Sequence, residues 1–251
     1  MATPVRGKNA RIIVDGYELT GQTNGVIIEG TVGILEWMVL MADAVNKEPN
    51  FADVKITHNG YYFGQAAGDL AREVNDRIAS AADTAVAAIL GAHYAAPTPP
   101  VAYVIPTSFA QQMRVESPLA NLMTVNGAWP TGSERAYRGN VVYYGDISAT
   151  GGKPVVDLGA AGVNGGRAWL HIIGVTGSLS GAVDIDLESH SSTSFSGGEA
   201  VEATFTNAAR GVQAQALSGS IGRYARINVG GLGGATALKV AVIAAVSGVH
   251  Y

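Results

Sequence analysis

The sequence has 251 residues and a formal net charge of −4; 47% of its residues are hydrophobic and 14% are charged. A chain of this length and polarity can bury one large core or two small ones, which excludes a mainly disordered protein. It contains no cysteine, which excludes a disulfide framework, a thiolate metal site and a cysteine nucleophile.

Residues 1–9 are polar and predict an N-terminal arm. Arg6 and Lys8 are not followed by an apolar run, so we expect no signal peptide. The longest apolar runs, Val32–Val45 and Ala237–Val246, are shorter than the roughly 20 residues that span a bilayer. We therefore expect synthesis in a cytoplasm and no membrane partner. The basic residues do not cluster, which disfavours tight DNA binding.

The first predicted element is a hairpin, in which Ala10–Val14 and Tyr17–Thr20 flank the turn pair Asp15-Gly16. A second turn at Asn24-Gly25 precedes strands at Val26–Glu29 and Ile34–Leu40. Because Met41–Ala52 is polar and contains a proline, we expect an extended loop there.

A second hairpin is predicted at Asp53–Gly64, with Asn59-Gly60 as its turn. One long helix is predicted at residues 68–91, where apolar residues recur at helical spacing and Gly91 supplies a C-terminal stop. Strands follow at Val101–Ile105 and Asn140–Tyr144. The segment Met113–Asn126 is weakly patterned.

The pattern changes after about residue 150, where a Gly- and Ala-rich stretch is followed by strands alone. We predict a first β domain at 1–152 with one flanking helix, a linker at 153–166, and a small β-sandwich domain at 167–251. The fold class is therefore mainly β, a barrel or sandwich followed by a second sandwich. The strands predicted in the second domain are Arg167–Val175, Ala182–Glu188, Ala200–Thr206, Val212–Leu217, Ile221–Val229 and Ala237–Val246.

The residues give little support for catalysis or for a metal site. The histidines are scattered and predict turn and surface positions rather than a zinc site; they are His58, His93, His171, His190 and His250. Asp184, Asp186 and Glu188 alternate along one strand and share a face, which predicts a solvated outer face with Arg226 across the sheet. Ser192 lacks the elbow motif of a catalytic serine. We expect no catalytic, cofactor-binding or metal residue, and no cofactor.

The opening Val5–Gly21 (VRGKNARIIVDGYELTG) resembles the start of the major tail proteins, or tail tube proteins, of long non-contractile-tailed bacteriophages. The order of a hairpin at Asp53–Gly64, a helix at 68–91 and a strand at Arg138–Tyr143 is similar too. In the second domain the similar stretches are Ala168–Ile172, Leu187–Ser191 with Phe195, and Gly219–Arg226. The sequence departs at Ser191–Ser194, where relatives commonly carry an Asp-Gly pair.

The resemblance implies a structural virion protein, with no enzyme activity, that forms hexameric or pseudo-hexameric trimeric rings stacked into a tail tube. It implies contacts with further copies and with tape-measure, tail-terminator and tail-tip proteins, while double-stranded DNA passes through without tight binding. In this interpretation the arm, with Arg6 and Lys8, and the long loop, with Lys47, Glu48, Pro49, Asn50 and Phe51, make the assembly contacts.

Two other hypotheses remain open from the sequence. The second domain is also compatible with a carbohydrate-binding or capsid-decorating β-sandwich. A hydrolase is the third hypothesis, for which the sequence offers no convincing nucleophile or metal set.

Overall fold

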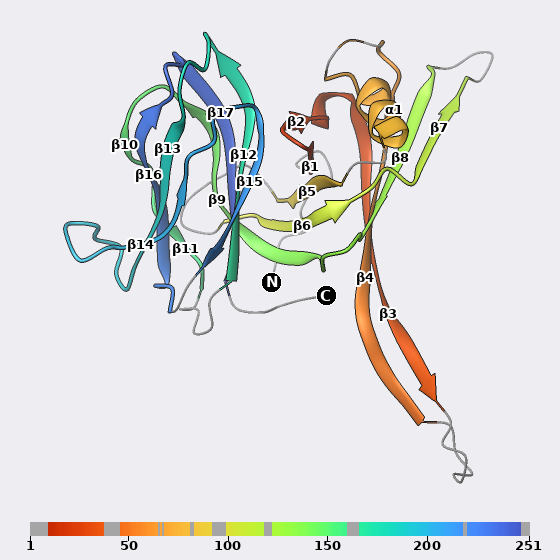
Figure 1. Ribbon diagram of the computed structural model, residues 1–251, viewed down its shortest axis with the longest axis horizontal. Helices are drawn as coiled ribbons and strands as arrows, with labels where there is room; N and C mark the ends of the chain where they lie inside the picture. Colours follow the sequence, from red (N-terminus) through yellow and green to blue (C-terminus); the bar gives the residue numbers. More distant parts are fainter. Residues whose placement is uncertain are drawn as a thin grey trace.

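The computed structural model shows a mainly β protein with one α-helix, as the sequence predicts (Figure 1). It describes residues 10–37, 46–64, 66, 68–80, 83–91, 99–117, 122–159, 166–217 and 220–246, and for 31–37 and 46–52 it describes the backbone alone. The described strands form three antiparallel sheets of eight, five and four strands.

The eight-stranded sheet runs through the middle of the molecule. In spatial order its strands are β15 (Gly211–Leu217), β12 (Gly166–Thr176), β17 (Ala237–Val246), β9 (Tyr137–Ile147), β6 (Val101–Ser108), β5 (Thr84–Leu90), β1 (Arg11–Val14) and β2 (Tyr17–Glu18). Because β9 pairs with both β6 and β17, the sheet joins strands from both sides of the predicted boundary. The division at 152 and 166 stays a prediction about folding units.

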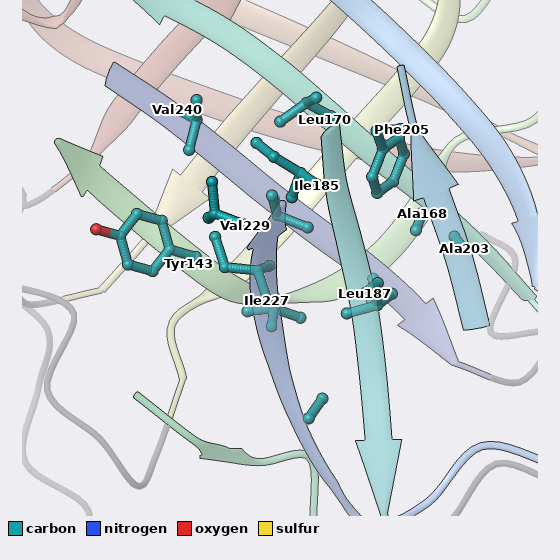
Figure 2. Close-up of a cluster of buried hydrophobic side chains, with 14 of the residues drawn as sticks. Tyr143, Ala168, Leu170, Ile185, Leu187, Ala203, Phe205, Ile227, Val229 and Val240 are labelled. Carbon is teal, nitrogen blue, oxygen red and sulfur yellow. The ribbon is translucent and has the colours of Figure 1, made fainter. Parts of the chain in front are cut away.

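A five-stranded sheet packs on one half of the eight-stranded sheet and completes a sandwich. Its strands are β10 (Gly151–Gly152), β16 (Tyr224–Leu232), β13 (Val183–His190) and β14 (Ala200–Phe205), with β11 (Val156–Asp157) also paired to β16. Part of the segment predicted as a linker is thus a strand, and Val156 is fully buried. Figure 2 shows the core between the sheets, where Leu170 and Val240 face Ile185, Ile227 and Val229.

The six strands predicted after residue 166 are all present. Strand β16 alternates between a core side and an outer side, whereas the middle parts of β12 and β17 are buried on both faces. Val183, Ile185 and Leu187 of β13 are buried, as the pattern predicts. The largest shift is in β16, which was predicted at Ile221–Val229 and spans Tyr224–Leu232.

The other half of the eight-stranded sheet curls around a second core. Strands β1, β5, β6, β9, β12 and β17 contribute buried side chains to it, among them Ile13, Ile89, Val104, Trp169 and Ile243. The predicted β1–β2 hairpin is confirmed, with Val14 opposite Tyr17. Asp15 and Gly16 both have positive φ, 45° and 79°, as a two-residue hairpin turn requires.

The four-stranded sheet has the order β3 (Thr23–Trp37), β4 (Asn46–Tyr61), β8 (Thr124–Pro130) and β7 (Gln112–Glu116). Helix α1 (Leu70–Ser80) covers one face of it (Figure 1). Leu70 and Val74 of the helix are buried in a third core with Ile56, Val125 and Trp129 of the sheet. A 3₁₀ turn, η2 (Thr20–Gln22), leads into β3.

The prediction of one helix over 68–91 is wrong in its second half. The helix ends at Ser80, and β5 begins at Thr84. Strand β5 is buried on both faces: Val86 and Ala88 face the core under α1, whereas Ala87 and Ile89 face the core of the curled sheet. A strand buried on both faces has a continuous apolar sequence, which periodicity does not distinguish from a buried helix.

The turns predicted at Asn24-Gly25 and Asn59-Gly60 are also wrong, because both pairs lie inside long strands. Gly25 stands at a bulge between β3 and β4. At Gly60 an added Cβ would overlap Leu70 Cδ2 and the carbonyl oxygen of Gln22, so this glycine permits a close approach of α1 to the sheet. The residues predicted as the hairpin Asp53–Gly64 instead belong mainly to β4.

Candidate assembly surfaces

The longest strands of the protein project beyond their own sheet. Strand β8 pairs with β4 only from Lys55 to Tyr61, while β3 pairs with β4 from Thr23 and Gly60 out to Trp37 and Asn46. In the described part of the chain, the outer half of this hairpin is therefore a ribbon of two strands. Figure 1 shows it projecting well away from the rest of the molecule. We call residues 31–37 and 46–53 the ribbon.

The structure corrects the local conformation of the predicted loop residues. Lys47, Glu48, Pro49, Asn50 and Phe51 belong to strand β4, so the prediction of an extended loop over Met41–Ala52 is wrong for residues 46–52. Pro49 lies opposite Ile34, at a point where the register shifts, and such irregularities accommodate proline in a strand. Arg6, Lys8 and residues 38–45 lie outside the described residues, so the assembly role of the whole set stays a prediction.

The four-stranded sheet presents a polar face on the side away from α1. Along β4 the side chains alternate: Val54, Ile56 and His58 are buried, whereas Thr57 and Asn59 are partly exposed. Asn59 lies directly opposite Asn126 of β8, which lies opposite Arg114 of β7. This row crosses three strands and lines a shallow groove of about 200 Å³; the other lining residues are Thr57, Gln112, Gly127 and Ala128.

The charges on this polar face nearly balance. Among the described side chains it carries two basic residues, Lys55 and Arg114, and three acidic ones, Glu29, Asp53 and Glu116. Arg114 Nε lies 2.8 Å from a carboxylate oxygen of Glu116. The face therefore binds water well but offers no strong net charge to a polyanion. The alternation of Val54 and Ile56 with Lys55 and Thr57 predicts the polar side of this strand, whereas its continuation across β8 and β7 comes from the register.

Both edges of the four-stranded sheet are unpaired within the described part of the chain. Strand β3 pairs there only with β4, and β7 only with β8. An unpaired edge presents a row of backbone N–H and C=O groups that can bond to a strand of another chain. The sheet thus has one free face and two free edges, and it is extended by the ribbon.

A polar cluster closes one end of the curled sheet. Glu18 accepts hydrogen bonds from Lys239 Nζ at 2.6 Å, from the Tyr144 hydroxyl at 2.8 Å and from Arg11 Nη1 at 3.0 Å. Burial alone would raise the pKa of Glu18, but the bonds from Lys239, Tyr144 and Arg11 hold it below its ordinary value. An open pocket of about 270 Å³ lies beside the cluster, also lined by Pro100 and Asp146.

Two histidines predicted at turns or on the surface are buried in cores. His58 and His171 are both fully buried, and burial lowers the pKa of each to about 4. His190 is the partly exposed last residue of strand β13, while His93 and His250 are outside the described residues. No group of three or more acidic or histidine side chains in the described part could hold a metal ion.

The acidic strand β13 is less solvated than predicted. Asp184 is exposed, but Glu188 is buried and lies 2.7 Å from Arg226 Nε, with Asn228 Nδ2 at 3.0 Å from its other oxygen. The expected pairing with Arg226 is confirmed by the register. Ser192 Oγ lies 2.9 Å from His190 Nδ1, which also accepts the Ser192 N–H, so these contacts brace the connection locally.

None of the helices described is long and apolar enough to cross a membrane. The described chain is thus a mainly β protein with a curled central sheet, a sandwich on one side, and a four-stranded sheet with an open polar face on the other. No family model and no curated protein matches it.

Three solved structures are similar to parts of the chain or to most of it. The first is the sheath–tube complex of an extracellular contractile injection system in the extended state, with 13% identity and a TM-score of 0.41 over 55% of this chain and 93% of the other. The second is the virion of a native gene transfer agent particle, with 12% identity and a TM-score of 0.40 over 52% and 96%.

The third is the SPP1 Dit protein, described as a paradigm of the hub adsorption apparatus of phages that infect Gram-positive bacteria. It is 9% identical, with a TM-score of 0.31 over 94% of this chain and 98% of the other. With TM-scores below 0.5, none of these similarities by itself establishes a common fold.

Proposed function

We propose that this protein is a structural subunit of a phage tail, and specifically that copies of it assemble into the rings of a tail tube. The observation that carries the proposal is the four-stranded sheet, which has two unpaired edges, an open polar face and a two-stranded extension. The sequence resemblance of Val5–Gly21 to tail tube proteins supports the same role.

The two free edges suit a ring because they differ from each other. Joining β3 of one copy to β7 of the next is a heterologous contact, and repetition of one such contact closes into a ring when its rotation divides the full circle. The backbone groups of both edges would then be paired. A free edge on a soluble monomer usually carries features that prevent pairing with other chains. An edge that is buried between copies does not need such features.

The open polar face then forms the wall of the channel. A wall over which DNA slides must be hydrated and must not hold phosphates, since each neutralised phosphate adds to the affinity of binding. Lys55 and Arg114 are outnumbered on this face by Glu29, Asp53 and Glu116, which meets that requirement. The sandwich that includes β13, β14 and β16 lies on the far side of the curled sheet, which would place it toward the outside of the tube (Figure 1).

Negative-stain electron microscopy of the purified full-length chain tests this function. We expect rings or tubes with a constant bore at high protein concentration. As a channel-wall control, Asn126→Lys with Thr57→Lys should leave the tubes intact while increasing their retention on DNA-cellulose at low salt. A chain that stays monomeric at every concentration, or that binds glycan arrays as a monomer, would contradict the proposal and favour a carbohydrate-binding module.

The same proposal includes contacts with a tape-measure protein, a tail terminator and tail-tip proteins in the assembled virion. Pull-down of each from co-expressed tail proteins, with the monomer as control, tests those partners one at a time.

A further inference from the structure

Asparagine is followed by glycine at three places in the described part of the four-stranded sheet. The pairs are Asn24-Gly25 in β3, Asn59-Gly60 in β4 and Asn126-Gly127 in β8. A fourth pair, Asn164-Gly165, lies outside the described residues. Asparagine is a thermolabile residue, and it is most labile before glycine, because no side chain then shields the following backbone nitrogen. The sheet therefore holds one reactive dipeptide in three different settings.

The reaction of such a pair needs no catalyst and no co-reactant other than water. The glycine nitrogen loses its proton to hydroxide and attacks the side-chain Cγ of the asparagine. A succinimide ring forms, the Cγ–Nδ2 bond breaks, and ammonia leaves with a proton taken from water. Water then opens the ring at either carbonyl carbon, which gives aspartate or isoaspartate. To reach Cγ the nitrogen must turn away from the position that it holds in an extended strand, so the rate depends on local opening of the backbone.

Two of the pairs are held in the middle of the sheet. Strand β4 is paired on both sides, to β3 and β8, and β8 is paired to β4 and β7. Gly60 and Gly127 are both buried. A Cβ added at Gly127 would lie 2.6 Å from Cε1 of the buried His58, and one added at Gly60 would overlap Leu70 of α1. Turning the backbone at either glycine therefore requires the sheet to open.

Asn24 lies in the opposite setting. It is exposed on β3, which pairs only with β4 in the described part of the chain. The register with β4 shifts between Thr23 and Gly25, so Asn24 is the extra residue of a β-bulge. The extra residue of a bulge is left outside the ladder of backbone hydrogen bonds. At Gly25 no atom lies within 4 Å of an added Cβ, so the space beside this glycine is open.

We propose that Asn24 is a site of spontaneous covalent modification, at which the folded protein forms a succinimide with Gly25 and converts to aspartate and isoaspartate. The bulge gives the backbone the freedom to turn, and exposure admits water. Conversion places a new carboxylate on the free edge of β3, and the isoaspartate product lengthens the main chain by the former Cβ. This chemistry is independent of whether copies of the chain assemble into a tube.

Peptide mapping by mass spectrometry tests the assignment on the full-length chain. Folded protein is kept at mildly alkaline pH, and the aspartate and isoaspartate forms of each pair are measured over time. We expect Asn24 to convert at least about tenfold faster than Asn59 or Asn126, because those two react only through opening of the sheet. In concentrated urea the three rates should converge, since unfolding removes the differences in setting.

Two glycine variants on β3 test the route. Gly25→Ala should lose most of the conversion at Asn24, since the methyl group shields the attacking nitrogen, and it should fold normally because the added Cβ meets open space. Gly30→Ala, whose added Cβ also meets open space, is the matched control and should convert at the parent rate. Undiminished conversion in Gly25→Ala would overturn the succinimide route.

The comparison of the three pairs can also overturn the site itself. Equal rates at all three pairs in the folded protein would do so, as would faster conversion at Asn59 or Asn126. Conversion of Asn24 in urea alone would overturn it too, because the bulge would then protect the pair instead of exposing it.

Discussion

The indole N–H of Trp129 donates a hydrogen bond to Nδ1 of His58 over 3.0 Å, joining β8 to β4 in the core under α1. A neutral imidazole that accepts at Nδ1 carries its proton on Nε2, and this Nε2 is buried with no hydrogen-bond partner in the described part of the chain. Protonation of His58 would therefore set two N–H groups against each other and bury a charge. Consistent with this geometry, burial lowers the pKa of His58 to about 4.

The first prediction is that the free energy of unfolding decreases as the pH is lowered from about 6.5 toward 4. The pKa values of His58 and His171 are about 4 when folded and 6.5 when unfolded, so in this interval the unfolded chain binds more protons. The contribution of each histidine to the free energy of unfolding is fully present above the unfolded pKa of 6.5. It decreases below that pH, by about 2 kcal/mol per histidine at pH 5. Urea unfolding of the monomer at pH 7.5, 6 and 5 measures the change.

Variants test whether the loss of stability at low pH comes from the buried imidazoles of His58 and His171. His58→Leu should remove roughly half of the decrease between pH 7.5 and 5, and His190→Gln, at the partly exposed end of β13, is the control variant. An undiminished pH dependence in His58→Leu would show that another group titrates in this range.

The second prediction concerns the contact between α1 and the sheet at Gly60. An added methyl group would overlap Leu70 Cδ2 and the Gln22 carbonyl oxygen, and the latter is backbone that cannot rotate away. Gly60→Ala should therefore destabilise the fold by about 1–3 kcal/mol. Gly30→Ala is the matched control, because no atom lies within 4 Å of its added Cβ. Equal midpoints of urea unfolding for the two variants would refute the close approach.

Gly60 also shows what local sequence could and could not predict. Asn59-Gly60 has the composition of a tight turn, and the sequence carries no sign that a helix residue ten positions away occupies the space a side chain would need. The turn at Asp15-Gly16 has the same composition and is correctly predicted, since there both positions adopt positive φ. Composition alone does not separate the two cases; the tertiary contact does.

The alternation of β13 made this strand predictable, whereas β5 carries no such pattern. Strand β13 alternates Val183, Ile185 and Leu187, which face the core, with acidic residues on its other face. Strand β5 has two buried faces and so carries no alternation. The row Asn59–Asn126–Arg114 depends on the register of three strands from distant parts of the chain, and only the structure supplies that register.

The third prediction concerns the polar cluster around Glu18. Glu18→Gln removes the charge that Arg11 and Lys239 share while keeping the size of the side chain, so two cations near the mouth of the curled sheet lose their counter-ion. We expect a loss of about 2 kcal/mol in unfolding free energy, below the cost for a fully buried pair because the two cations are about one-third exposed. Asp76→Asn, which breaks the exposed ion pair with Arg72 on α1, should cost less than about 0.5 kcal/mol. Similar losses in both variants would contradict a special role for the cluster.

The last prediction concerns the closure of the curled sheet. Arg210 Nε donates a hydrogen bond of 2.8 Å to the Gly16 carbonyl oxygen, and its guanidinium lies 4.0 Å from the centre of the Tyr17 ring. These contacts hold the β1–β2 turn against the end of β15, where an added Cβ on Gly16 would approach Gly211 N to 2.7 Å. The fold thereby joins the first strands of the chain to one of the last.

Removal of this contact should open the hairpin locally. In Arg210→Ala, hydrogen exchange of the Asp15 and Leu19 amides, which bond to Ala85 O and Ile12 O, should become about five- to tenfold faster, while amides of β13 and β16 keep their rates. Arg210→Lys should give an intermediate effect, because a lysine retains the cation over Tyr17 but lacks the planar Nε–H. Faster exchange spread evenly over all three sheets would mean that Arg210 supports global stability rather than the closure. Unchanged exchange of the Asp15 amide would mean that packing of Gly16 against Gly211 alone holds the turn.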